Sequence, residues 1–222
     1  MSHNKLSRHE LKEDGFVTFV LEAREYMREN QNKLFAGLIV LIVVVAGAIW
    51  MNNSRMQARE SAEAQFSEAL ASYGAGQIKT AEEMFKIIDD RFGSLEQGVC
   101  SLYFLGKIAL AEGRNTEATA YFEEYISMSS KYPFFRDPAR EGLAVSYENA
   151  RDYVKASEIY LELSEDLSSN KFMGETYLER AADNLQLANQ RTRAIEVLEK
   201  LVEMTSGEKR RNLEIQLDLL RG

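Results

Sequence analysis

The feature that most constrains the fold is a repeat of 37 or 38 residues that fills most of the chain. Four alanines mark it at spacings of 37, 38 and 38 residues, at Ala81, Ala118, Ala156 and Ala194. A large apolar residue follows each alanine by four positions, at Phe85, Phe122, Tyr160 and Leu198. Another small residue precedes each alanine by twelve positions, at Ala69, Gly106, Ala144 and Ala182. This pattern predicts pairs of helices that each bury a face against the next pair.

The same register places a turn five residues before each alanine. Gly76 and Gly113 occupy this position in the first two copies, and Arg151 and Asn189 occupy it in the last two. The chain has only two prolines in 222 residues, which favours long uninterrupted helices. We therefore predict an all-α chain with four helix–turn–helix units in residues 52–205.

A further helix is expected after the fourth unit, in residues 206–222. Ser206 stands at its start, where a hydroxyl can cap a helix. An apolar stripe at helical spacing follows, formed by Leu213, Leu217 and Leu220. Because the last unit of a stacked array needs a cover for its apolar face, this segment is predicted to be a capping helix.

The units resemble the tetratricopeptide repeat (TPR), most clearly in the second copy, through Leu105, Gly106, Gly113, Ala118 and Phe122. The repeat is longer than the family's usual length of about 34 residues. The first copy also has a glutamate, at position 68, where an apolar residue is usual. The resemblance implies a solenoid of helical hairpins that binds peptides or proteins on the face lined by the first helix of each pair.

By the family's pattern, three positions on each first helix face the ligand. They are Phe66, Leu70, Tyr73, Tyr103, Lys107, Leu110, Glu141, Val145, Glu148, Glu179, Asp183 and Gln186. This face would be aromatic near the start of the array and acidic near its end, which favours hydrophobic or basic ligands. Two plainer readings remain open: the aromatic side chains pack against the neighbouring helix, and the carboxylates are solvated surface.

An apolar segment precedes the repeats. Residues 34–51 are eighteen consecutive residues without a polar side chain. Lys33 precedes this segment, and Trp50, Asn52 and Arg55 mark its other end. As a helix, this segment spans about 27 Å, close to the thickness of the hydrocarbon core of a bilayer. We predict a single transmembrane helix that acts as an uncleaved anchor, with the lipid bilayer as its partner. The sequence leaves open whether this helix continues unbroken into the first repeat.

The tail before the anchor, residues 1–33, has six basic and six acidic side chains. Apolar residues recur in it at helical spacing and predict an amphipathic helix, at Phe16, Phe19, Val20, Ala23 and Met27. Such a helix could lie on the lipid surface or dock on a partner membrane protein. Near the membrane, three basic residues precede the span and two follow it, at Arg24, Arg28, Lys33, Arg55 and Arg59. This small bias favours a cytoplasmic tail and a repeat domain on the other side.

Catalytic chemistry is not expected. The two histidines, His3 and His9, lie in the first ten residues, and the lone cysteine, Cys100, therefore has no nearby histidine to activate it. The glycines of residues 93–98 have the spacing of a phosphate loop but lack its Lys and Ser/Thr, so we interpret them as a turn. The net charge of −8 argues against nucleic-acid binding. We predict no cofactor, metal or small-molecule substrate, and keep an anchored hydrolase with carboxylates alone as a remote alternative.

The whole layout resembles the YfgM-like proteins of Gram-negative inner membranes. The run from Tyr26 through Glu29, Asn30 and Lys33 to Leu34 is similar to the segment preceding their span. Those proteins sit beside the SecYEG translocon and associate with the periplasmic chaperone PpiD. The resemblance implies an inner-membrane protein with a periplasmic TPR domain that assists protein export as a scaffold or chaperone adaptor. The alternatives are a scaffold of another envelope assembly or secretion machine, and an import receptor with its TPR domain in the cytosol.

Overall fold

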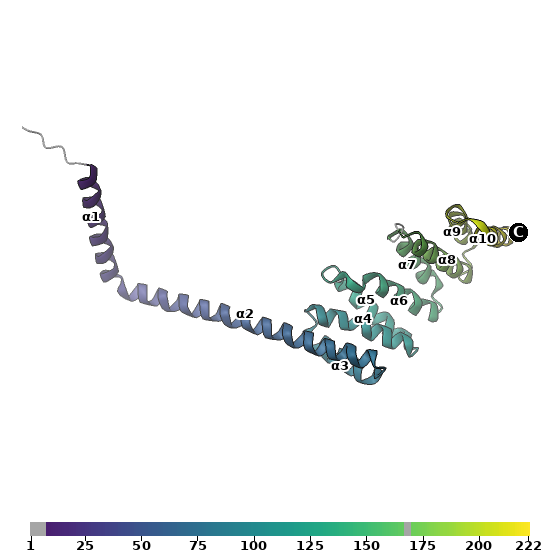
Figure 1. Ribbon diagram of the computed structural model, residues 1–222, viewed down its shortest axis with the longest axis horizontal. Helices are drawn as coiled ribbons and strands as arrows, with labels where there is room; N and C mark the ends of the chain where they lie inside the picture. The colour runs from purple at the N-terminus through teal and green to yellow at the C-terminus, as the bar shows by residue number, and fades with distance from the viewer. Residues whose placement is uncertain (1–7, 167–169) are drawn as a thin grey trace, which may run out of the picture. The chain divides into compact units, whose positions relative to one another are not determined.

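The computed structural model describes the backbone of residues 8–166 and 170–222, and side chains from residue 15 onward within those ranges. Regular structure in these residues is entirely helical, as the repeat predicts (Figure 1). The chain divides into two units, Met1–Gln57 and Ala58–Gly222. The prediction of an all-α repeat protein is confirmed.

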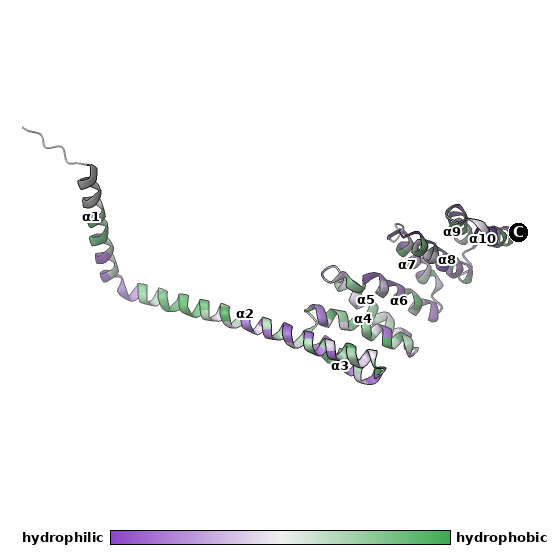
Figure 2. Cartoon of the chain, in the orientation of Figure 1, coloured by the Kyte–Doolittle hydropathy of each residue, from purple (hydrophilic) through white to green (hydrophobic). Residues whose placement is uncertain are grey.

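The first unit contains α1 (Arg8–Glu29) and the beginning of α2 (Gln31–Gly74), with Asn30 between them. Helix α2 is one continuous helix, long and apolar enough in its first half to span a membrane. Figure 2 shows this part of α2 as a continuous apolar band. The apolar side chains of residues 34–51 are exposed, as expected of a segment whose solvent is lipid.

The second unit is a stack of helical pairs in chain order (Figure 1). The end of α2 pairs with α3 (Ile78–Phe92) through a shared apolar cluster. Helix α4 (Glu96–Ala111) pairs with α5 (Asn115–Met128), and α6 (Arg136–Asn149) with α7 (Tyr153–Asp166). A short 3-10 helix, η1 (Pro133–Phe135), leads into α6. Helix α8 (Lys171–Leu187) pairs with α9 (Arg191–Met204), and α10 (Gly207–Arg221) closes the stack.

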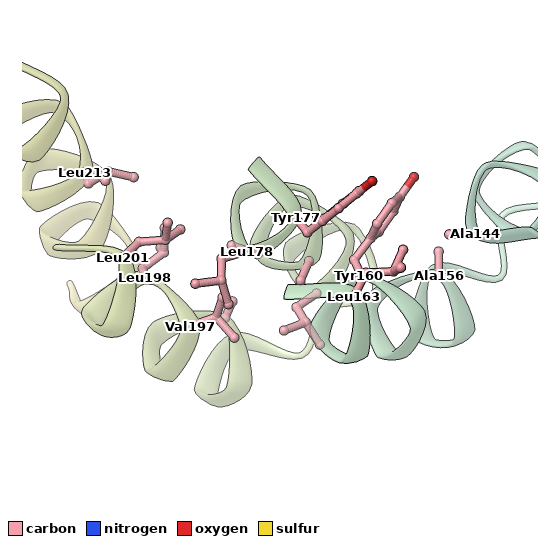
Figure 3. Packing of buried hydrophobic residues seen from close by; sticks show 14 of the residues in the cluster. Ala144, Ala156, Tyr160, Leu163, Tyr177, Leu178, Val197, Leu198, Leu201 and Leu213 are labelled. Carbon is pink, nitrogen blue, oxygen red and sulfur yellow. The ribbon is translucent and has the colours of Figure 1, made fainter. Parts of the chain in front are cut away.

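The repeat register determines the core. The alanines that mark the repeat, and the small residues twelve positions before them, are buried in the structure. The large residues that follow the alanines are also buried, and the largest of them are completely inaccessible: Tyr125, Tyr160, Phe85 and Phe122. Three clusters of these side chains run through the stack, and the last continues from α6 to α10 (Figure 3).

The turns inside the pairs use the left-handed conformation. Gly76 and Gly113 have φ angles of +77° and +74°, and Arg151 and Asn189 adopt the same region at +61° and +57°. In each turn, the next N–H donates to a carbonyl near the end of the preceding helix, for example from Arg114 to Ala109. A left-handed residue is therefore required at the position that the alignment of the repeats identifies.

The capping helix is where the sequence predicts it. Leu213 and Leu217 are buried against the last pair, and Leu220 is partly buried beside them. Ser206 precedes the first residue of α10, but its hydroxyl makes no capping hydrogen bond. Its backbone is extended, and Gly207 follows with a φ of +66°, so this helix begins without a side-chain cap.

Candidate functional site

The first helices of successive pairs are joined by direct side-chain contacts. Tyr177 of α8 donates to Glu141 of α6 at 3.1 Å, and Lys209 of α10 pairs with Glu179 of α8 at 2.5 Å. We call the surface formed by α10 and by the first helices of the pairs, α2, α4, α6 and α8, the first-helix face. It comprises the predicted residues Phe66, Leu70, Tyr73, Tyr103, Lys107, Leu110, Glu141, Val145, Glu148, Glu179, Asp183 and Gln186.

At the aromatic end of this face, the side chains are built into the core. The ring of Phe66 lies 5.8 Å from Phe85 and 5.9 Å from Phe104, edge to face. Tyr73 contacts the same two rings, and Leu70 is partly buried in the same cluster. These side chains pack against neighbouring helices as well as bordering the surface. This packing agrees with the interpretation of the sequence in which the aromatic side chains pack against the neighbouring helix.

Tyr103 and Lys107 form the boundary between this aromatic end and solvent. Tyr103 is 9% exposed and its ring stacks on Phe135 at 4.5 Å, nearly parallel. The ammonium of exposed Lys107 lies 5.7 Å from the ring of Tyr73 and 5.6 Å from that of Tyr103. Burial raises the pKa of Tyr103, and the charge of Lys107 opposes that shift. The result is a positive charge held over two aromatic rings at the surface.

The middle of the face is a hydrogen-bonded network between α6 and α8. Glu148 accepts from the amide of Asn184 at 2.5 Å and from Arg180 at 3.3 Å. Arg180 also donates to the hydroxyl of Tyr160 at 2.7 Å. Tyr160 lies beside Tyr177 (Figure 3), and the centroids of the two rings are 6.0 Å apart. The carboxylate of Glu148 therefore already has hydrogen-bond partners within the chain.

Tyrosine acidity reflects this environment. Burial first, and then the carboxylate of Glu141, raise the pKa of Tyr177 to about 12. The phenol therefore stays protonated at neutral pH and remains a donor to Glu141. For Tyr160 the pKa shift is in the same direction and has the same main cause, with Glu148 as the neighbouring charge.

The distal end of the face is different. Within residues 8–166 and 170–222, Asp183 has no hydrogen bond or ion pair, although Arg180 is near enough to lower its pKa slightly. The side chain of Asp183 is exposed at the surface; its partial desolvation raises the pKa of its carboxyl, and the nearby carboxylates of Glu179 and Glu148 add to this rise. Beside it is a cavity of about 210 Å³, lined by Glu179, Ala182, Asp183, Leu198, Leu213 and Gln216. Polar side chains (Glu179, Asp183, Gln216) and apolar ones (Ala182, Leu198, Leu213) share this lining, and such a mixture beside an unpaired carboxylate suits the charged head and aliphatic stem of a lysine or arginine.

Sequence reasoning missed several residues that shape this face. Phe104 holds the aromatic end together through the contacts above, and Arg180 and Asn184 hold the middle. Asn184 is 2% exposed, and within the described residues its Oδ1 has no hydrogen-bond donor. The only signal for the middle network was the spacing of 36 residues between Glu148 and Asn184, about one repeat.

The loop of residues 131–138, which contains both prolines, has two neighbouring aromatic residues in different environments. Phe135 fills the seam between α4 and α6, and the hydroxyl of Tyr125 donates to the carbonyl of Tyr132 at 2.8 Å. Phe134, the residue before Phe135, is 67% exposed. The loop therefore plugs the seam and also presents one free aromatic ring.

The other residues singled out by the sequence have structural roles or lie beyond the described part. Cys100 is buried in α4, and burial raises its thiol pKa to about 11. Gly98 lies at the start of α4, where a Cβ would collide with the backbone of Phe92, so this glycine serves close packing. In the part of the chain whose side chains are described, no cluster of His, Cys, Asp or Glu could hold a metal ion. The side chains of His3 and His9 lie outside it.

No family model matches this chain, and no curated protein matches its sequence. Two solved structures of TPR-like repeats are similar to it, from a kinesin light chain-like protein of Podosopora anserina and from a single-substitution variant of that protein. The variant is 17% identical, with a TM-score of 0.54 over 71% of this chain and 84% of that one. The other is 16% identical, with a TM-score of 0.53 over 72% of this chain and 94% of that one. The likeness establishes a TPR-like fold.

Proposed function

We propose that this chain is a membrane-anchored scaffold that binds segments of other proteins on its first-helix face. The observation that carries this proposal is the unpaired Asp183 beside a cavity of mixed polar and apolar lining at the distal end of that face. The TPR-like fold supports it, because stacked helical pairs create extended surfaces that suit an elongated ligand. No catalytic step is assigned to the chain.

The ligand class follows from charge and apolar surface. Glu179 and Glu148 are engaged by basic side chains and Glu141 accepts from Tyr177, so among the predicted carboxylates of this face Asp183 is the one without a partner in the described residues. The cavity beside it has Leu198 and Leu213 in its wall, which can hold an aliphatic stem. The preferred ligand is therefore a lysine- or arginine-containing segment with apolar neighbours.

Binding of short peptides to the full chain in nanodiscs tests this assignment. Asp183→Asn should weaken binding of an arginine-containing peptide up to about tenfold, which corresponds to about 1.4 kcal/mol. Glu196→Gln, an exposed position of α9 outside the face, is the matched control and should leave the affinity unchanged. Equal losses from both substitutions would indicate a general charge effect, and no loss from either would rule out Asp183 as the cation site.

A photo-crosslinking residue locates the binding face in cells. Placed at Val145 on the first-helix face, it should give discrete adducts with client proteins. Placed at Ile87 of α3, which is 49% exposed and lies on a second helix, it should give none. Adducts from Ile87 alone would assign binding to the second helices instead.

The cellular role that we propose is ancillary to protein export. In this proposal, α2 crosses the inner membrane, the tail lies in the cytoplasm, and the repeat domain in the periplasm assists exported proteins near SecYEG and a chaperone such as PpiD. The apolar first half of α2 and the basic residues before it support the anchoring and the orientation. The resemblance in layout to YfgM-like proteins supports the partners.

A further inference from the structure

Helix α1 has an exposed apolar face. At 100° per residue, the side chains at positions 16, 19, 20, 23 and 27 fall within an arc of roughly 100°. Phe16, Phe19 and Met27 are 68%, 67% and 55% exposed. Rings of this size are rarely left in water without a partner, so this face requires a cover.

The charged residues of α1 lie on both sides of that face. Glu25 lies on the opposite side of the helix from the apolar arc, and Glu22 and Glu29 lie between Glu25 and the border of the arc at Phe19. Arg24 lies beside the other border, at Val20, and Arg28 lies further from the arc on the same side; both are exposed. A cation beside the apolar face at Arg24, with Glu25 directed away from that face, suits a negatively charged lipid surface.

The apolar face of α1 continues into α2. Only Asn30 separates the two helices, and the apolar stretch of α2 begins four residues later, at Leu34. A cavity of about 250 Å³ at this junction is lined by Met27 of α1 and by Gln31, Leu34, Phe35 and Leu38 of α2. Four residues of helix extend only about 6 Å. If residues 34–51 cross the bilayer, the end of α1 therefore lies at the level of the lipid headgroups.

We propose that α1 lies in the headgroup region of the bilayer, with Phe16, Phe19 and Met27 in the lipid and Arg24 and Arg28 paired with anionic headgroups. The lipid surface is favoured over a protein because the face is continuous with the lipid-facing surface of α2. This inference rests on the proposed anchoring by residues 34–51. It adds a second membrane contact, which would restrain the tail at the interface.

Site-directed spin labelling of the full chain tests it. In a Cys100→Ala background, single cysteines replace Phe19, Glu22, Glu25 or Val43, and the labelled protein is reconstituted into vesicles of phosphatidylcholine and phosphatidylglycerol. Collision rates with oxygen, which concentrates in lipid, and with a water-soluble nickel chelate report the surroundings of each label. We expect the ratio of oxygen to nickel collisions to be several-fold higher at Phe19→Cys than at Glu22→Cys or Glu25→Cys.

The label at Val43, inside the apolar stretch, separates this inference from the anchor on which it rests. One outcome is a lipid-like ratio of oxygen to nickel collisions at Val43→Cys together with equal, water-like ratios at positions 19 and 22. This result would contradict the interfacial position of α1 and leave the anchor intact. A water-like ratio at Val43→Cys overturns the anchor itself. Spin–spin broadening at Phe19→Cys that disappears on dilution with unlabelled protein would show that a second copy of α1, and not lipid, covers the apolar face.

A double substitution tests whether the charges of Arg24 and Arg28 contribute to membrane binding by α1. Arg24→Gln together with Arg28→Gln should lower the oxygen ratio at position 19 in the anionic vesicles and have little effect in pure phosphatidylcholine. Glu25→Gln, on the side directed away from the lipid, is the matched control and should not lower it. An equal effect of the arginine pair in both kinds of vesicle would contradict a role for anionic headgroups.

Discussion

The ring of Phe122 packs directly against Gly106, so that a Cβ at position 106 would lie 2.7 Å from it. Phe122 comes from α5 and Gly106 from α4, and Gly142 of α6 meets the tip of the same ring, where a Cβ would lie 2.5 Å from its Cζ. One completely buried ring therefore joins three helices at positions where only glycine fits.

Gly106→Ala should therefore destabilise the repeat domain. We expect a loss of about 1–3 kcal/mol in the free energy of unfolding, because the methyl group forces the ring of Phe122 from its position. Gly74→Ala, at the end of α2 with open space around it, is the control and should cause no loss. Urea unfolding of the full chain in detergent, followed by circular dichroism, measures both. A neutral Gly106→Ala would contradict the tight contact.

The left-handed turn residues predict a gain in stability. Arg151 has a φ of +61°, which costs a residue with a Cβ about 1 kcal/mol. Arg151→Gly should therefore raise the free energy of unfolding by up to about 1 kcal/mol, less the extra entropy of glycine in the unfolded chain. Asn189→Gly should change it little, because asparagine tolerates this region. An equal response of the two turns would show that backbone strain is not what distinguishes them.

Asp89 predicts a pH dependence of stability. Burial, then the charges of Glu124 and Asp90, raise the pKa of its carboxyl to about 6, above the value of 3.8 expected in the unfolded chain. The folded state therefore holds the proton more tightly, so the contribution of Asp89 to stability falls as the pH rises from about 4 to about 6.

Asp89→Asn should remove this loss. We expect a gain of about 1 kcal/mol at pH 7, a value discounted because the side chain is partly exposed, and no gain at pH 3.5 or below. Glu83→Gln, on an exposed part of the same helix, is the matched control. Chemical unfolding at several pH values provides the test, and a gain independent of pH would assign the effect to something other than proton binding.

The capping helix offers a comparison between two nearby leucines. Leu217 is 6% exposed and Leu219 is 78% exposed. Leu217→Ala should cost about 2–3 kcal/mol, since it opens a cavity against the last pair, whereas Leu219→Ala should cost almost nothing. Thermal unfolding of the full chain in detergent compares them. Equal effects would mean that α10 does not seal the stack through Leu217.

Most of the fold could be predicted because one repeat register specifies it four times. Ala81, Ala118, Ala156 and Ala194 mark the buried positions, and the turn residue five positions earlier is left-handed in every unit. A short packing distance and a positive φ each impose a residue type that can be read from the sequence.

The site could be predicted only in outline. The resemblance assigns residues to a face, but it does not say what lies across from them on the neighbouring helix. The engagement of Glu148 by Asn184 and Arg180, and the packing of Tyr103 on Phe135, depend on how far successive helices are shifted along their axes. The units are longer than the usual TPR, so that shift could not be transferred from the family.

Protease treatment of intact spheroplasts, with a tag at each end of the chain, tests the central claim most directly. If the repeat domain is anchored by α2 and faces the periplasm, the C-terminal tag is lost and the N-terminal tag survives. Crosslinking to SecYEG would then be meaningful. If the C-terminal tag is cleaved only after lysis, the domain faces the cytoplasm, which contradicts the export role and favours a receptor for cytosolic clients.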